Sequence, residues 1–286
     1  MTERLADISA RIEGIRELGS VVNAMKGIAG ARAHAARAQL HAVDSFAATI
    51  AAALVRILGP STPGGGGGPG DGAGQRGLLV FAAEQGFAGA FSERVLDRVA
   101  EILEPALLFL IGTRGLSIAA ARGVTPHWSA ALPSHTPGIP GLADRITTAI
   151  YRAVAEGRID RLDVVFSGWE DGRPTVLVRR LFPIDPADLA PATSNRPLTQ
   201  LPDDTLIAAL GQEYFNAQVC KAALHAFAAE NQARMEAMTS AGNQIGRELE
   251  TFEATLRRVR QEAITAEIIE LGTGAAAAGP ARRAGG

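Results

Sequence analysis

The chain has 286 residues, enough for about two domains of ~100–200 residues each. Apolar residues make up 47% of the chain but aromatic residues only 5%, a composition that favours closely packed helices over an aromatic-rich β-sandwich. The net charge of −2 leaves no overall positive field for nucleic acid, and the single cysteine, Cys220, excludes an intrachain disulfide or a cysteine metal cluster.

Residues 1–58 carry apolar side chains at alternating steps of three and four. The series begins with Leu5, Ile8, Ile12 and Ile15 and continues through alanine-rich turns to Leu54 and Ile57. A heptad spacing held over many turns is typical of a coiled coil and is not needed by a single helix on a globular core. The spacing therefore predicts one long helix whose apolar seam needs a partner helix.

Residues 59–76 form a Gly/Pro-rich stretch with too few apolar side chains to pack, which predicts a mobile linker. Strand-like and helix-like patterns then alternate through residues 77–202. The strands are expected at 78–82, 106–111, 124–128, 162–167 and 175–182, and the helices at 92–103, 115–121 and 142–155. The alternation predicts a Rossmann-like α/β domain with a mostly parallel sheet.

Residues 203–271 repeat the heptad pattern and predict a second long helix. Asp203 and Asp204 suit its start, and Gly272 is expected to stop it, which leaves 272–286 as a disordered tail. Two heptad helices at opposite ends of one chain bury their seams most simply against each other, as an antiparallel coiled coil with the α/β domain inserted between them. Because the helices differ in length, part of the second needs a partner outside this chain.

Common devices of catalysis, cofactor binding and metal binding are missing from the sequence. There is no GxxxxGK[ST] phosphate loop, and the two GxGxxG matches between residues 65 and 77 precede a strand instead of following one. The five histidines lack ligand spacing, and Cys220 suits a small buried filler better than a nucleophile. The longest unbroken apolar runs, 50–55 and 106–111, are far shorter than the ~20 residues that span a bilayer. We therefore expect no catalytic, cofactor or metal site and no membrane span.

Three arginines, Arg257, Arg258 and Arg260, lie within one turn near the end of the second long helix, followed by Gln261 and Thr265. Guanidinium groups form paired hydrogen bonds with carboxylates, so the cluster is a candidate contact with an acidic partner surface. The alternative is a cation cluster that offsets the helix dipole, which acts in the last turn of a helix. The cluster lies well before Gly272, and this position favours the partner contact.

The order of these parts resembles the γ subunit of the F-type ATP synthase, over residues 5–271. The resemblance rests on Arg11-Ile12, Ala24-Met25 and Ile28-Ala29 in the first helix, on Ala229-Glu230, Arg234-Met235 and Ala237-Met238 in the last, and on a closing RQxxIT motif from Arg260 to Thr265. The segments 86–91 and 111–115 resemble two turns of the family's middle domain. Departures at Glu17-Leu18, Ser20 and Arg196-Pro197 indicate a divergent branch, for which the alternative sodium- or proton-driven F-type ATPases are one candidate.

The resemblance implies a non-catalytic rotor subunit, the central stalk that couples ion translocation to ATP synthesis or hydrolysis at the β subunits. The implied partners are the α and β subunits of the catalytic head, the ε subunit and the c-subunit ring, at the cytoplasmic face of the bacterial inner membrane; neither nucleic acid nor direct membrane contact is implied. The implied head contacts are Met25, Arg257, Arg258, Arg260, Gln261 and Thr265, and those on the ε and c-ring side are Glu84, Gln85 and Arg196. The alternative function is a free-standing coiled-coil scaffold with an α/β head, which would not need the RQxxIT motif.

Overall fold

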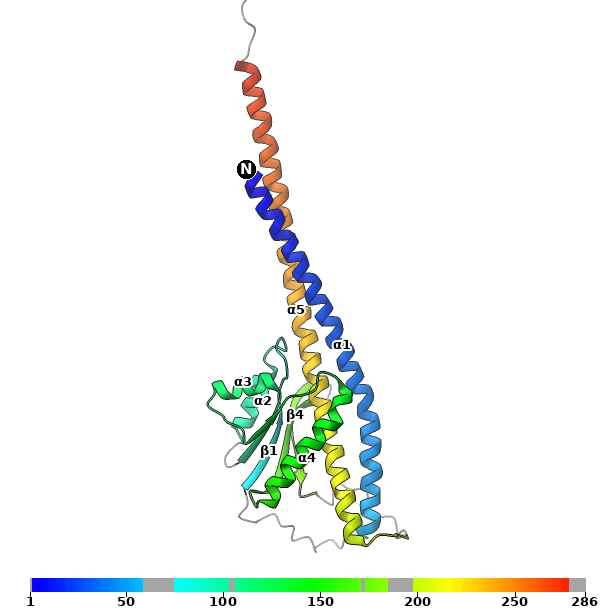
Figure 1. Cartoon of the computed structure of the whole chain (residues 1–286). Helices are drawn as coiled ribbons and strands as arrows, with labels where there is room; N and C mark the ends of the chain where they lie inside the picture. The colour runs from blue at the N-terminus through cyan, green and yellow to red at the C-terminus, as the bar shows by residue number, and fades with distance from the viewer. Residues whose placement is uncertain (1, 59–74, 103–105, 171–172, 185–197, 278–286) are drawn as a thin grey trace, which may run out of the picture. The chain divides into compact units, whose positions relative to one another are not determined.

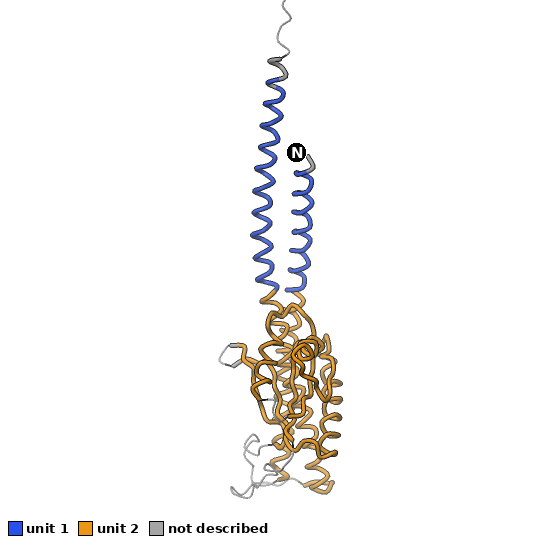
Figure 2. Tube along the Cα trace, turned by 90° about the vertical axis from the view of Figure 1, so that its left-hand side faces the viewer, with its two compact units in different colours: residues 1–26, 238–286 blue, residues 27–237 orange. Residues whose placement is uncertain are grey.

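The computed structural model describes residues 2–58, 75–102, 106–170, 173–184 and 198–277. Two long helices, α1 (Thr2–Leu58) and α5 (Asp203–Ala277), enclose an α/β domain in the chain order (Figure 1). The chain divides into two compact units, unit 1 with Met1–Lys26 and Met238–Gly286 and unit 2 with Gly27–Ala237 (Figure 2). The predicted N- and C-terminal helices with a central α/β domain are thereby confirmed.

In unit 1, α1 and α5 run antiparallel with their apolar seams in contact. Ile12 of α1 and Val259 of α5 are buried, whereas the side chains that flank them are exposed. A Cβ atom built on Gly19 would lie 3.4 Å from the Ile245 side chain, so the seam is closely packed even at a glycine. The heptad spacing thus predicts which face of each helix is covered.

In unit 2, the first turns of the α1 seam consist of small side chains, and larger ones such as Leu54 follow. Ala29, Ala33 and Ala36 are at most 1% exposed, and alanine at such positions lets two helices approach closely. Polar contacts lie beside the seam: Lys221 Nζ is 2.6 Å from Asp44 Oδ1. The low aromatic content of the chain is explained by these alanine-rich contacts.

The α/β domain contains one five-stranded sheet. Its strands are β1 (Gln75–Phe81), β2 (Ala106–Ile111), β3 (Trp128–Ala130), β4 (Ile159–Glu170) and β5 (Arg173–Phe182), in the order β3-β2-β1-β4-β5. Neighbouring strands are parallel except β4 and β5, which are antiparallel. The continuous apolar runs of β1 and β2 suit parallel strands covered on both faces, and the predicted mostly parallel sheet is confirmed.

Helices cover both faces of this sheet. On one face, α4 (Ile139–Ala155) and α5 pack over Leu79 and Phe81 of β1. The short 3-10 helix η1 (Thr136–Gly138) directly precedes α4. On the other face, α2 (Phe91–Ala100) and α3 (Thr113–Ala121) pack over Leu78 and Val80. Alternate residues of β1 therefore belong to two different cores, as the period of a strand requires.

The strand predicted at 124–128 is present but later in the chain, as β3 at Trp128–Ala130, because residues up to Val124 still close the end of α3. Gly123 has φ +73°, and the Val124 amide donates to the Ala119 carbonyl, which closes the end of α3. The His127 amide donates to the Leu108 carbonyl at 2.8 Å, and the ladder with β2 starts at Trp128, opposite Phe109. The strand predicted at 106–111 matches β2, and the other expected strands and helices are present with shifted ends. Strand β1 already begins at Gln75, inside the predicted linker, and 59–74 lie outside the described residues.

The helix stop predicted at Gly272 is wrong, since α5 continues to Ala277. Thr273 Oγ1 donates to the Ile269 carbonyl at 2.9 Å, as in a regular helical turn. A glycine inside a helix costs only ~1 kcal/mol relative to alanine, and the alanines that follow are the best helix formers. Residues 272–277 belong to the helix instead of the predicted tail, and 278–286 lie outside the described residues.

Helix α1 meets the length and composition criterion for crossing a membrane over Arg4–Leu58, where an 18-residue window has a mean hydropathy of 1.4. The prediction from unbroken apolar runs overlooked this window, because alanines between scattered polar residues raise the mean without forming a long run. A core helix of a soluble protein passes the same criterion, so one such helix is weak evidence for a membrane span.

Cys220 lies in the core of unit 2 and is 8% exposed. Burial, and after it the nearby Asp144 carboxylate, raises the pKa of the Cys220 thiol to about 11. A thiol with this pKa stays protonated at neutral pH, and the thiolate is the reactive form. The packing agrees with a role as a buried filler.

We expect Cys220 to react about a hundredfold more slowly in the native chain than in the unfolded chain at pH 7.5, because the raised pKa lowers the thiolate fraction by that order. The measurement is the rate of thiol modification by Ellman's reagent with and without guanidinium. Equal rates in the two states would show that the thiol is accessible and ionised normally.

Candidate functional site: the end of α5 and the loop after β1

The last part of α5 extends beyond the start of α1 within unit 1. Val22 lies next to Gly242, where a Cβ would be 3.9 Å from its side chain. The helices are antiparallel, so residues before Val22 on α1 lie opposite residues after Gly242 on α5. Counted along both helices, Thr2 at the start of α1 lies opposite about Glu262. The residues of α5 after Glu262 therefore have no α1 partner, and Figure 2 shows one helix of unit 1 continuing past the start of the other.

The predicted arginine cluster lies just before this extension, with its side chains exposed. Arg257, Arg258, Arg260, Gln261 and Thr265 are all on the solvent side of the helix, and the last of them donates its hydroxyl to the Gln261 carbonyl at 2.9 Å. Within the described residues the only ion pair of these arginines joins Arg258 to Glu262, at 3.9 Å and exposed. The guanidinium groups are therefore available to carboxylates of another molecule. The helix end at Ala277 places the cluster still farther from the last turn than the sequence indicated.

Apolar side chains follow the arginines on the unpartnered extension. Ile264, Ile268 and Leu271 are 51%, 63% and 69% exposed. A row of large exposed aliphatic side chains marks an interaction surface more often than a free surface. This end of α5 combines arginine forks with an apolar surface.

The other predicted contact residues lie in both units. Met25 is half-buried on α1, in unit 1, whereas Gln85 is exposed and Glu84 is partly buried in the loop after β1, in unit 2. Arg196 lies outside the described residues. The structure therefore brings the arginines together with Gln261 and Thr265, and Glu84 together with Gln85.

The loop after β1 is held to α5 by a buried ion pair. The amides of Glu84 and Gln85 donate to the two carboxylate oxygens of Glu230, at 3.1 and 3.2 Å. Arg234 pairs with the same carboxylate at 2.5 Å and also donates to the carbonyls of Gln85 and Gly86. The Glu230 and Arg234 side chains are only 3% and 7% exposed, so both charges are compensated inside the core. We call this pair the clamp.

The Glu84 carboxylate is also engaged inside the domain. It accepts hydrogen bonds from the Thr113 amide at 2.9 Å, the Thr113 hydroxyl at 2.7 Å and the Leu132 amide at 2.8 Å. Glu84 thus joins the loop after β1 to the start of α3 and to the segment after β3. Its carboxylate has a structural role that the sequence did not reveal.

Phe87 is a candidate contact residue that the sequence reasoning missed. Its side chain is 68% exposed at the loop after β1, and its φ of +61° is unusual for a residue with a bulky side chain. The clamp fixes the backbone at Gln85 and Gly86 on the N-terminal side of Phe87. An exposed aromatic ring on a fixed loop is typical of an interface anchor.

Comparison with known proteins agrees with this architecture. A family model described as ATP synthase matches residues 4–278. The chain is 26% identical over 281 residues to the ATP synthase gamma chain of Moorella thermoacetica, and the alignment covers 95% of this chain and 98% of that protein. It is also 26% identical over 299 residues to the ATP synthase gamma chain of Frankia casuarinae, with 96% and 98% covered.

Among solved structures, a chain in the OSCP/F1/c-ring part of the Euglena gracilis mitochondrial ATP synthase matches with a TM-score of 0.65 and 13% identity, over 100% of this chain and 99% of that one. A chain of the rotor of the same enzyme matches with a TM-score of 0.60 and 13% identity, over 92% and 100%. These likenesses show the fold. Because the family model spans nearly the whole sequence and the curated relatives are covered almost end to end, the chain belongs to the ATP synthase gamma chain family.

Proposed function

We propose that this chain is the central-stalk rotor subunit of an ATP synthase, without catalytic activity of its own, which couples ion translocation to ATP synthesis or hydrolysis at the β subunits. The observation that carries the proposal is the end of α5, where exposed arginines precede an apolar helix that has no partner in this chain. The similar structures from Euglena gracilis are a rotor and an F1/c-ring assembly, which supports the proposal.

The two units are proposed to contact different partners. The end of α5, with Arg257, Arg258, Arg260, Gln261 and Thr265, and Met25 of α1 would contact the α and β subunits of the head. Gln85 and Phe87 of the α/β domain would face the ε subunit and the c ring, together with Arg196, which lies outside the described residues. The Glu84 carboxylate would keep its internal bonds. The chain would then be a peripheral protein at the cytoplasmic face of the bacterial inner membrane.

The proposed coupling mechanism depends on the asymmetric surface of a two-helix coil. Two helices have different side chains on different sides, so a coil turning inside a ring of subunits offers each β subunit a changing surface. A ligand shifts a conformational equilibrium only as far as it binds the two states differently. Each orientation of the coil would therefore favour one β conformation, and rotation would carry that preference from one subunit to the next.

Co-purification tests the rotor assignment. A tagged chain expressed in its own host is expected to bring down the α and β subunits in a complex that hydrolyses ATP, whereas the purified chain alone should hydrolyse none. A tagged chain recovered without α and β would favour the free-standing scaffold. ATP turnover by the pure chain would contradict the non-catalytic role.

Replacing both Arg260 and Gln261 by alanine is expected to reduce ATP-driven ion pumping severalfold in reconstituted vesicles, because truncating an interfacial arginine costs about 1–3 kcal/mol. The measurement is the pumping rate divided by the hydrolysis rate. Arg152→Ala, an exposed arginine of α4 in unit 2, is the matched control and should leave the ratio unchanged. An unchanged ratio in the double variant, in a fully assembled complex, would remove these residues from the coupling contact.

A further inference from the structure

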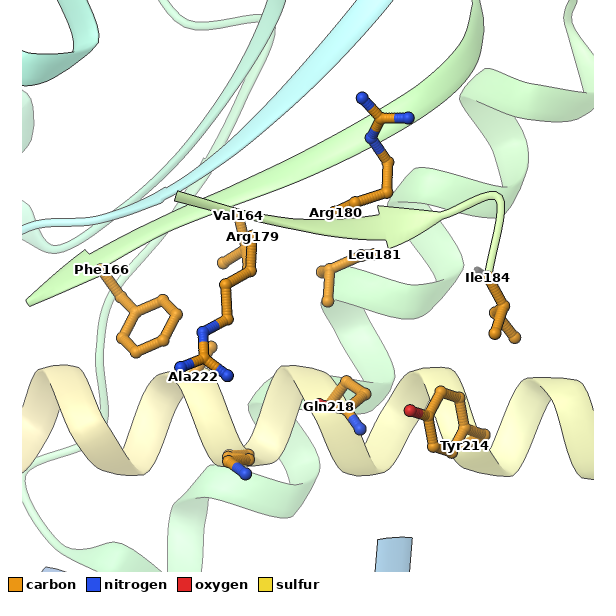
Figure 3. Close-up of a pocket in the computed structure, with 10 residues that line it drawn as sticks. Val164, Phe166, Arg179, Arg180, Leu181, Ile184, Tyr214, Gln218 and Ala222 are labelled. Atoms are coloured by element: carbon orange, nitrogen blue, oxygen red, sulfur yellow. The ribbon is translucent and has the colours of Figure 1, made fainter. Parts of the chain in front are cut away.

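A cavity of about 470 Å³ lies in unit 2 between the edge strand β5 and helix α5 (Figure 3). Apolar side chains from the sheet, among them Phe166 and Leu181, form one wall, and Tyr214 and Gln218 of α5 form part of the other. Ligand pockets are commonly ~300–1,000 Å³ and mostly apolar, with a few convergent polar groups. The size therefore suits a small organic molecule and exceeds what a single inorganic ion would fill.

The charged side chains that line this cavity are all cationic. They are Arg179, Arg180 and Lys221. Arg180 is directed away from α5 (Figure 3). Its guanidinium lies 2.6 Å from the buried Asp163 carboxylate, which it shares with Arg76. Lys221 is paired with the half-exposed Asp44.

Arg179 differs from the other two cations. Its side chain is directed from β5 toward α5, between Phe166 and Gln218 (Figure 3). No carboxylate forms an ion pair with it in the part of the chain that the structure describes. A guanidinium offers a planar fork of donors that matches the oxygens of a phosphate or carboxylate. The cavity therefore contains an anion-binding group without an anion from this chain.

His225 lies next to one wall of the cavity. Its ring packs at a tilt against Phe166, with centroids 5.6 Å apart. Burial lowers the pKa of His225, and the positive charges of Lys221 and Arg179 lower it further, against the opposing effect of Asp44. The neutral imidazole is therefore favoured beside the cavity, mainly by burial and in part by the two cations.

We propose that this cavity binds a phosphorylated small molecule, with Arg179 and Lys221 around the phosphate and the apolar wall of Phe166 and Leu181 against the rest of the ligand. A phosphate monoester carries nearly two negative charges at neutral pH and offers more acceptor positions than a carboxylate. It therefore suits Arg179 and the Gln218 amide, and it would compete with the half-exposed Asp44 for Lys221. The proposal does not depend on the rotor assignment, because it uses residues of unit 2 that have no part in it.

Calorimetric titration of the full-length chain with adenosine monophosphate and with inorganic phosphate tests the proposal. Both are expected to bind saturably at one site, the nucleotide more tightly because its apolar part contacts the wall. Arg179→Gln should weaken both by about tenfold or more, since a bidentate charged contact is lost. Arg94→Gln, which removes an exposed arginine of α2, is the matched control and should leave both affinities unchanged. Absence of saturable binding, or equal affinity for Arg179→Gln and the unchanged chain, would overturn the proposal.

A nuclear magnetic resonance titration of His225 locates the site independently. Saturation with adenosine monophosphate should raise the pKa of His225, because an anion near Arg179 and Lys221 stabilises the imidazolium ion. The rise should be absent in Arg179→Gln. Binding that leaves the His225 titration unchanged would place the nucleotide elsewhere and overturn the assignment.

Arginine modification in the assembled complex distinguishes a free ligand from a carboxylate of a neighbouring subunit. Phenylglyoxal should modify Arg179, as detected by peptide mass spectrometry, and adenosine monophosphate should protect it while Arg94 stays reactive. Protection of Arg179 in the complex without nucleotide would show that a subunit covers the cavity, and this would overturn the proposal of a small-molecule site.

Discussion

Replacing Arg234 by methionine is expected to lower the free energy of unfolding by about 3–5 kcal/mol, because the change leaves a buried carboxylate without its counterion. Glu230 is 3% exposed and its charge is compensated by Arg234, while the amides of Glu84 and Gln85 supply the remaining hydrogen bonds. Methionine retains most of the aliphatic length but cannot donate to the Gln85 and Gly86 carbonyls. The measurement is urea unfolding followed by the fluorescence of Trp128 and Trp169, which both lie in unit 2.

The second variant of the clamp separates lost charge compensation from lost packing. Adding Glu230→Gln to Arg234→Met removes the uncompensated charge while keeping an acceptor for one of the loop amides, so the double variant should be more stable than Arg234→Met alone. Arg122→Met is the surface control, because Arg122 and Asp97 form an exposed pair and its loss should cost no more than ~1 kcal/mol. If Arg234→Met were no more destabilising than this control, the clamp would not be a stabilising element.

The loop that the clamp holds could not be predicted from the sequence. Glu230 and Arg234 are spaced by four residues and were identified through the family resemblance, yet their partners lie about 145 residues earlier in the chain. Helix periodicity reveals neighbours along one helix and the face that is buried. It cannot reveal which loop meets that face. The pair was therefore predicted as part of a motif, and its role in fixing the loop was not.

Long elements could be predicted because their signal repeats many times. The apolar seam from Ile12 to Leu54 repeats over several heptads, so the pattern is still recognisable when one position, such as Gly19, is not apolar. Single boundary residues have no such redundancy. The helix stop predicted at Gly272 rests on one residue, and the two glycines at 272 and 274 cost the helix too little to end it before the alanines.

The candidate contacts were predictable to different degrees for the same reason. Arg260 and Gln261 belong to a contiguous motif, and the structure leaves them exposed as a contact requires. Phe87 becomes a candidate only when the fold holds its backbone at φ +61° with the ring exposed. The cavity beside Arg179 lies between β5, which ends at Phe182, and α5, which begins at Asp203, so no local sequence pattern could predict it.

Replacing Gly112 by alanine is expected to destabilise the chain by at least about 3 kcal/mol, for two reasons that act together. Gly112 has φ +110°, a conformation that side chains disfavour, and a Cβ there would lie 2.5 Å from the Ala82 carbonyl oxygen and 2.7 Å from that of Ala83. Backbone oxygens cannot move aside as a flexible side chain can. The Gly112 amide also donates to the Ala130 carbonyl at 2.9 Å, so any shift disturbs the junction of β1, β2 and β3.

Gly141→Ala provides the control for the same chemical change in the same unit. Gly141 lies in α4 with nothing within 4 Å of a new Cβ, so alanine there should raise stability by up to ~1 kcal/mol through helix propensity. Opposite shifts of the urea midpoint in the two variants would show that the backbone position, and not glycine content, decides the outcome. A midpoint for Gly112→Ala equal to that of the unchanged chain would mean that β1 and β2 separate easily at this turn. The hydrogen bonds from Thr113 to Glu84 would then not hold the loop that carries Phe87, and the proposed contact on the α/β domain would lose its fixed geometry.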